Sequence, residues 1–291
     1  MAFRDPLGDR MKGNYENRSK TYLTRRTPVI IRIDGKAFHT FTRGFCRPYD
    51  RVFHNSMNAT LEYLCKNIQG CKFGYTQSDE ITLVLTDYDK LTTDGWFDYS
   101  VQKMCSIAAS MATFIFNRVF LEECRKWFEE SPIFVSDENG EFGVTSQEVK
   151  DLFNTYSRAA ERGAMFDARC FNIPEDEVAN CIIWRQNDAT RNAVQMLGQT
   201  YFSHKELEGK SQSDIQDMLM EVHQINFNDM PVEFKRGICC FRNYMVSSPW
   251  GNSMFDTTKD EGEWVLDKKC PIISQDREYV ERHVYTKEYK S

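Results

Sequence analysis

Residues 29–35 read VIIRIDG, and residues 77–85 read QSDEITLVL. Each segment joins a run of aliphatic and β-branched residues, which predicts a buried strand, to an acidic cluster at Asp34 or at Asp79-Glu80. A carboxylate at a strand end, beside a glycine that allows close approach of the backbone, is suited to holding a divalent cation, and two neighbouring strands can hold two cations. Because Asp-Gly and Ser-Asp are also ordinary turn dipeptides, hairpin turns without a ligand remain the alternative.

The composition is that of a globular protein with a sizeable core. The 291 residues are 41% hydrophobic and 27% charged. We expect a soluble, cytoplasmic protein with no membrane partner, because no stretch approaches the roughly 18 apolar residues of a membrane span and no signal peptide is evident. The ten cysteines include no CxxC pair, so neither a disulfide framework nor a structural zinc site is expected. The net charge of −6 leaves local basic patches possible.

The predicted elements around the two acidic clusters follow the order β-α-β-β-α-β. Strands are predicted at 29–34, 71–75, 80–86 and 165–173, and helices at 49–67 and 96–120. Residues 125–164 are expected to be less regular, with a small hairpin near Asn139-Gly140. This order over 28–173 is the split βαβ, or ferredoxin-like, arrangement of an α+β fold, in which the first strand neighbours the hairpin that follows. Asp34 and Asp79 can therefore meet at one edge of the sheet.

Six short motifs in register carry a family resemblance over residues 4–240. They are IDGKAFH at 33–39, FCRPYD at 45–50, QSDE at 77–80, WF at 96–97, FDAR at 166–169 and WRQ at 184–186. Together they resemble the tRNA-His guanylyltransferase family. The resemblance implies a polymerase-type palm that adds nucleotides to RNA 5′ ends in the 3′-to-5′ direction. It also implies two Mg²⁺ ions, ATP and GTP or another nucleoside triphosphate as substrates, tRNA as a partner, and a homotetramer.

The resemblance assigns the acidic clusters to catalysis. It implies that Asp34 and Asp79 bind the metal ions and that the Gly35 carbonyl completes the coordination, a donor set suited to Mg²⁺. Glu80 matches the acidic neighbour of the second aspartate. On a regular strand its side chain points away from that of Asp79, so we expect it to support the site rather than bind metal. The alternative for Glu80 is a surface carboxylate.

The resemblance also implies a set of nucleotide contacts, drawn from the segment after the first strand, the basic positions and the turn. These are Gly35, Lys36, Ala37, Phe38, His39, Arg47, Asp50, Ser78 and Lys103. Backbone N–H groups that follow a strand can face a triphosphate. Ordinary alternatives exist: Phe38 as a core anchor, which we favour, Asp50 as a helix cap, and Lys103 as a surface lysine. His39 is equally well interpreted as a solvated loop residue.

Arg169, Arg185 and Asn192 are the candidates for RNA contacts, with ordinary surface arginines as the alternative for the first two. Residues 189–195 read ATRNAVQ where eukaryotic members carry HINNLYN, so only Asn192 remains in register. The chain thus looks like the bacterial, archaeal or phage guanylyltransferase-like members, which are associated with template-dependent repair of truncated tRNA 5′ ends. Strict tRNA-His specificity is therefore not implied.

Four ranges are expected along the chain: a basic arm at 1–27, a palm-like catalytic domain at 28–174 with an insertion at 125–164, a tRNA-facing helical and strand region at 175–248, and a C-terminal extension at 249–291 that wraps the surface. The basic arm takes its charge from Arg18, Lys20, Arg25 and Arg26. Two other functions remain open on the same palm. One is a nucleotide cyclase or oligonucleotide synthase, and the other is a tRNA-binding protein without catalysis.

Overall fold

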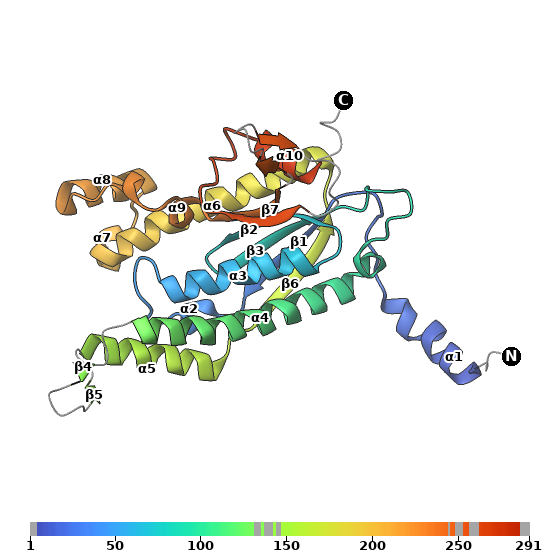
Figure 1. Ribbon diagram of the computed structural model, residues 1–291, viewed down its shortest axis with the longest axis horizontal. Helices are drawn as coiled ribbons and strands as arrows, with labels where there is room; N and C mark the ends of the chain where they lie inside the picture. Colours follow the sequence, from blue (N-terminus) through green and yellow to red (C-terminus); the bar gives the residue numbers. More distant parts are fainter. Residues whose placement is uncertain are drawn as a thin grey trace.

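The computed structural model describes residues 5–130, 135–136, 142–143, 147–243, 245–247, 253–255 and 262–285. Its centre is a six-stranded antiparallel sheet of order β10-β7-β2-β3-β1-β6 (Figure 1). The strands of this sheet are β1 (Val29–Gly35), β2 (Cys71–Gln77), β3 (Glu80–Leu85), β6 (Phe166–Asn172), β7 (Ile238–Asn243) and β10 (Glu263–Asp267). Two short hairpins lie outside it, β4 (Val135–Ser136) with β5 (Phe142–Gly143) and β8 (Met245–Ser247) with β9 (Ser253–Phe255).

The helices surround this sheet on both faces. The long ones are α3 (Arg51–Asn67), α4 (Val101–Glu130), α5 (Gln147–Arg162) and α6 (Glu175–Tyr201). The shorter ones are α1 (Pro6–Asn14), α2 (Phe38–Phe41), α7 (His204–Leu207), α8 (Gln212–His223), α9 (Val232–Arg236) and α10 (Glu278–Val284). α1 extends away from the body at one end of the molecule, while α7 and α8 lie at the other (Figure 1).

The predicted β-α-β-β-α-β order is confirmed. β1, α3, β2, β3, α4 and β6 follow one another along the chain, and their strands take the order β2-β3-β1-β6 in the sheet. The side chains of β1 alternate between the two faces of the sheet, which explains why the core has two sides. Ile31 and Ile33 face a cluster with α3 and α4, whereas Ile30 faces a second cluster with α6 and α10. Because β1 is buried on both faces, its sequence is continuously apolar until it reaches Arg32 and Asp34.

Local chemistry sets the ends and the packing of α3. Asp50 caps its first turn by accepting the Phe53 N–H at 2.9 Å. Opposite the helix, a β-carbon on Gly74 would lie 2.5 Å from Cys65 Sγ and 2.7 Å from Leu61, so glycine in β2 permits the close approach of α3 to the sheet. This packing holds β2, and with it the turn that carries Asp79, against the core.

Two expectations from the sequence need correction, and a third is tested only in part. The helix predicted at 96–120 begins only at Val101, because Phe97, Asp98 and Tyr99 have left-handed φ angles of 51–56° and break the helical path. The range expected to be irregular contains the helix α5, whose Tyr156 and Ala159 are buried. The strands of the predicted hairpin are present as β4 and β5, but its tip near Asn139-Gly140 lies outside the described residues.

The C-terminal part of the chain contributes to the sheet. β7 pairs with β2, and β10 pairs with β7 as the edge strand, so the extension does more than wrap the surface. Strands from 28–174 and from 175–248 share one sheet. The division of the chain into these ranges stays a prediction.

The expectation that no stretch reaches the length of a membrane span also needs correction. The helix α4 holds an 18-residue window of mean hydropathy 1.5 and so meets the length and composition of a spanning segment. The window contains alanine, serine and threonine residues, so it reaches this mean hydropathy without an unbroken run of apolar residues. In the structure the buried side of α4, with Met104, Ala108 and Phe116, packs into the core beside β1 and β6.

Candidate metal and nucleotide site

The structure brings Asp34 and Asp79 together at one end of the sheet. Asp34 lies near the end of β1, and Asp79 lies in the turn between β2 and β3. The Gly35 N–H donates to the Asp79 carbonyl at 3.1 Å, which joins the strand end to this turn. Ser78, with a left-handed φ of 53°, donates its hydroxyl to Asp79 Oδ1 at 3.1 Å. The turn therefore orients the Asp79 carboxylate beside β1, as the predicted topology requires.

Both carboxyl groups hold their protons more tightly than usual. Burial, and next the neighbouring Asp34, raises the pKa of Asp79 to about 6. Burial also raises the pKa of Asp34, with further contributions from Glu80 and Asp167. A cation placed between the two carboxylates would relieve both the desolvation and the mutual repulsion. Carboxylates that repel one another in this way are poised to bind a divalent ion.

Glu80 is held by arginines on the face of the sheet that α6 covers. Cross-strand pairing sets it directly opposite Asp34, so both side chains lie on this face. The Arg32 guanidinium donates to Glu80 Oε2 at 3.0 Å, and Arg185 Nε of α6 lies 2.6 Å from Oε1 as an ion pair. Since the Glu80 side chain is only 15% exposed, the alternative of a surface carboxylate is wrong. Its oxygens face arginines, as expected of a group that supports the site.

Sequence reasoning missed two neighbours of Asp34. Asp167 of β6 lies directly opposite Asp34 on the other side of β1, and Arg32 lies two residues before Asp34 on the same face. The sequence signal that could have identified Arg32 is a single arginine within a segment predicted to be a buried strand. Asp167 stands in the FDAR motif, but only the antiparallel register shows that it faces Asp34.

The donor set fits Mg²⁺. The Gly35 carbonyl accepts no hydrogen bond from a described residue, so its lone pairs are free beside the two carboxylates. Within the described ranges, no group of three or more His, Cys, Asp or Glu side chains is arranged to hold a metal. Two carboxylates and a carbonyl suit Mg²⁺, which retains several waters and binds through substrate phosphates rather than in an all-protein cage.

The segment after β1 offers fewer backbone donors than expected. The N–H groups of Gly35 and Lys36 are already bound to the carbonyls of Asp79 and Met165. Those of Ala37, Phe38 and His39 have no partner among the described residues, because a left-handed φ of 56° at Ala37 turns the chain into α2. The expected phosphate contact is therefore confined to these last three N–H groups and stays a prediction.

Phe38 is a core residue, which confirms the interpretation we favoured. Its ring is 4% exposed and lies 5.0–5.9 Å from those of four other phenylalanines. A β-carbon on Gly35 would lie 2.3 Å from this ring, so the glycine beside Asp34 is required by packing. Lys36 and His39, by contrast, are exposed.

Asp50 has its hydrogen-bonding capacity used within the protein. Besides capping α3, it accepts from the Cys46 N–H at 3.0 Å and from the Tyr156 hydroxyl at 2.8 Å, and it is 7% exposed. Asp50 is therefore a helix cap, as its alternative interpretation held, and few acceptor positions of its carboxylate remain for a nucleotide. Arg47 and Lys103 are exposed, with Lys103 Nζ 5.9 Å from the centre of the Phe97 ring. Their contacts with a triphosphate stay predictions.

The three RNA candidates lie in different surroundings. Arg169 of β6 and Asn192 of α6 are exposed, and Arg169 pairs with Asp167 at 3.2 Å. Arg185 is not an ordinary surface arginine, because its side chain is 12% exposed and lies between Glu80 and Asp188. The contacts of all three with RNA stay predictions.

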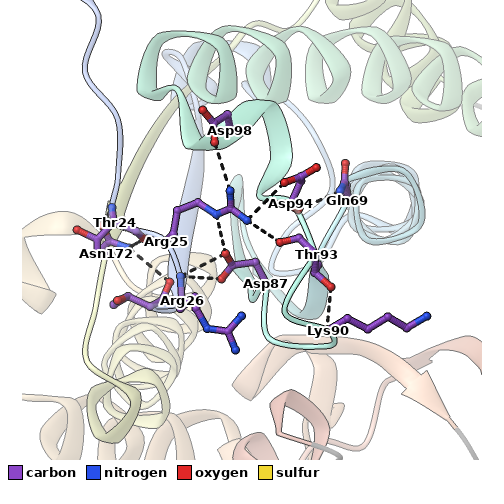
Figure 2. Close-up of polar contacts among 11 residues, drawn as sticks. Thr24, Arg25, Arg26, Gln69, Asp87, Lys90, Thr93, Asp94, Asp98 and Asn172 are labelled. Atoms are coloured by element: carbon purple, nitrogen blue, oxygen red, sulfur yellow. Dashed lines mark hydrogen bonds and ion pairs between the residues drawn. The ribbon is translucent and has the colours of Figure 1, made fainter.

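The expected basic arm is partly neutralised, as Figure 2 shows. Arg25 Nε donates to the fully buried carboxylate of Asp87 at 3.0 Å, and the Arg26 N–H donates to the same group at 2.9 Å. The Arg25 guanidinium also lies 3.5 Å from Asp94 and from Asp98 (Figure 2). Arg25 therefore anchors the N-terminal segment to the loop before α4 and is not available as part of a free basic surface.

Comparison with known proteins agrees with this site. The family model described as tRNAHis guanylyltransferase matches residues 8–174, which include the first five motifs. Among solved structures, a bacterial tRNA(His) guanylyltransferase-like protein in complex with ATP is 41% identical with a TM-score of 0.74, covering 96% of this chain and 99% of that one. A bacterial protein of the same description in complex with GTP is 38% identical with a TM-score of 0.70, covering 97% and 100%.

A curated relative from Dictyostelium discoideum, a probable tRNA(His) guanylyltransferase, is 24% identical over 87% of this chain and 88% of its own length. The family match spans the elements that carry Asp34 and Asp79, and the solved structures extend the likeness over almost the whole chain. The chain belongs to the tRNA-His guanylyltransferase family of nucleotidyltransferases.

Proposed function

We propose that this protein is a template-dependent 3′–5′ nucleotidyltransferase that adds nucleotides to the 5′ end of tRNA, in 5′-end repair, in G addition to tRNA-His, or in both. The observation that carries the proposal is the convergence of Asp34 and Asp79 through the Gly35–Asp79 hydrogen bond, in a chain of this family. The solved relatives with ATP and with GTP support nucleoside triphosphates as substrates.

In this mechanism the 5′-phosphate of a monophosphorylated tRNA attacks the α-phosphorus of ATP and releases pyrophosphate, which leaves an adenylylated 5′ end. The 3′-hydroxyl of an incoming nucleoside triphosphate then loses its proton and attacks the 5′-phosphorus of the tRNA, which forms the new phosphodiester bond and displaces AMP. Two Mg²⁺ ions would supply Lewis acidity at the hydroxyl and at the transferring phosphoryl group. Asp34, Asp79 and the Gly35 carbonyl would hold them. Glu80, held by its ion pairs with Arg32 and Arg185, would support the site beside Asp34 rather than bind the ions.

The remaining residues would bind and orient the triphosphate. The N–H groups of Ala37, Phe38 and His39, which have no partner in the described part of the chain, are suited to phosphate oxygens, and the exposed Arg47 and Lys103 would neutralise their charge. Arg169 and Asn192 are the exposed candidates for tRNA. We also propose a cytoplasmic homo-oligomer, a tetramer by family resemblance, in which several copies together present enough basic surface for RNA.

The test is a 5′-extension assay with ATP and Mg²⁺ on tRNA-His and on 5′-truncated tRNAs, with each base in turn opposite the new nucleotide. We expect addition that follows the template base and is abolished in Asp34→Ala and Asp79→Ala. Asp94→Ala, which removes an 81% exposed carboxylate, is the control and should retain activity. Near-normal addition by the first two variants would refute the assignment.

Two outcomes would favour the other functions. Cyclic or short oligonucleotide products formed from nucleoside triphosphates without RNA would indicate a cyclase or a synthase. Salt-sensitive tRNA binding without any incorporation of nucleotide would indicate a non-catalytic binding protein.

A further inference from the structure

One edge of the sheet is formed by β6, which pairs with β1 on one side and with no described strand on the other. An edge strand presents unpaired backbone groups that can bind another strand. Two features of β6 determine what kind of strand can pair with this edge. They are the direction of its backbone N–H and carbonyl groups and the order of its side chains.

The register shows which backbone groups face outward. The Lys36 N–H donates to the Met165 carbonyl at 2.8 Å, and the Ile173 N–H donates to the Pro28 carbonyl at 3.1 Å. These bonds lie at the two ends of the β1–β6 ladder and mark its hydrogen-bonded pairs, which alternate along antiparallel strands. Residues 167, 169 and 171 therefore bond to β1, and residues 166, 168 and 170 direct their N–H and carbonyl groups to the open edge.

Side chains of α4 bond to the outward backbone N–H groups only at the start of this edge. Thr113 accepts the outward N–H of Phe166 at 3.1 Å, and Asn117 accepts that of Ala164 at 2.7 Å. No described residue bonds to the backbone N–H or carbonyl of Ala168 or to the backbone N–H of Cys170. Among the described residues, the outward backbone groups in the middle of β6 thus have no hydrogen-bond partner, and Ala168 lies at their centre.

The side chains around Ala168 are complementary to themselves in the antiparallel direction. If two copies of β6 pair about a two-fold axis at Ala168, Asp167 of each copy lies opposite Arg169 of the other. One step further out, Met165 lies opposite Phe171. Asp167 and Arg169 are 59% and 55% exposed, and Met165 is 57% exposed although it is apolar. Directly opposite charges stabilise an antiparallel pair, so the sequence fits a second copy of itself better than an arbitrary strand.

We propose that the β6 edges of two copies of this chain pair antiparallel about Ala168 and form one continuous sheet. The outward groups of Ala168 would bond to their counterparts in the second copy, and each Cys170 N–H would bond to the Phe166 carbonyl across the axis. Because Asp34 lies beside Asp167 on the same face, the two metal sites would open on one side of the joined sheet. This interface does not rest on the proposed reaction.

A charge exchange tests the interface through the oligomeric state. Wild-type mass by sedimentation velocity should be a multiple of the 34.2 kDa chain. Asp167→Arg and Arg169→Asp each place like charges opposite one another, so each should weaken association about tenfold or more and halve the mass. The double variant Asp167→Arg/Arg169→Asp restores opposite charges and should restore the mass. Lys66→Glu, on α3, is the matched control and should leave the mass unchanged.

A second measurement requires no substitution. In hydrogen exchange, the amides of Ala168 and Cys170 should become more protected as protein concentration rises, while that of Phe166 stays protected throughout because Thr113 binds it. Four results would overturn the proposal: a monomeric wild type, single variants of unchanged mass, a double variant that stays dissociated, or exchange at Ala168 that is independent of concentration. Circular dichroism of each variant verifies that the fold is retained, and the result does not depend on nucleotide addition.

Discussion

Replacing Asp79 by asparagine should stabilise the metal-free protein at neutral pH. The carboxyl group has a pKa of about 6 in the folded protein against 3.8 for an ordinary aspartate, because it is buried beside Asp34. At about 1.4 kcal/mol for each tenfold change in proton affinity, keeping it ionised at pH 7 costs about 3 kcal/mol of the free energy of unfolding. Partial contact with solvent reduces this, so we expect a gain of about 1–3 kcal/mol. Asparagine keeps an acceptor for the Ser78 hydroxyl.

The direction of the pH dependence follows from the raised pKa. A group whose folded pKa exceeds its unfolded value stabilises the protein fully below the unfolded value, near pH 4, and this contribution is lost as the pH rises through 6. Asparagine does not titrate. The advantage of Asp79→Asn should therefore be greatest at pH 7.5, fall to about half at pH 5 and largely vanish near pH 4.

Urea unfolding at these three pH values, with EDTA present, measures the effect. Asp94→Asn serves as the control, since its 81% exposed carboxylate should change stability by less than about 0.5 kcal/mol at every pH. Adding Mg²⁺ should stabilise the wild type but not Asp79→Asn, because only a folded chain with both ligands binds the ion. A loss of stability in metal-free Asp79→Asn at pH 7.5, or a gain that does not decline toward pH 4, would refute the reasoning.

Three further substitutions test the elements that position the site, each by urea or thermal unfolding. Asp87→Asn should lower the free energy of unfolding by about 2–3 kcal/mol, because it removes a buried charge that accepts hydrogen bonds from Arg25 and from the Arg26 N–H. Asp94→Asn, near the same guanidinium, should lower it little, and equal losses in the two variants would contradict this. Asp50→Ala should lower the free energy of unfolding by about 2–3 kcal/mol, because it deletes the helix cap and two further hydrogen bonds. Asp50→Asn should lower it clearly less, and the reverse order would contradict the capping role. Gly35→Ala should cost about 1–3 kcal/mol through collision with Phe38, and a neutral result would show that the ring can move.

The strands and the metal pair could be inferred from local patterns. The apolar runs of β1 and β3 mark strands whichever neighbours they have, and the β-α-β-β-α-β order then leaves few ways to arrange them. Asp34 and Asp79 could be placed near one another for the same reason. The patterns did not predict α5 or the late start of α4. The first is an amphipathic helix within a polar insertion, and the second depends on three residues with left-handed φ angles.

The sequence by itself determined the family, the order of strands and helices, and the two carboxylates, since all of these are carried by short motifs and by periodicity along the chain. Only the tertiary structure decided the partners of those groups. It placed Asp167 opposite Asp34, engaged Arg185 with Glu80, and assigned Asp50 to a helix cap. The physical reason is that cross-strand register and long-range ion pairs depend on how distant segments pack, and a side chain's role follows from the charges and donors it meets there.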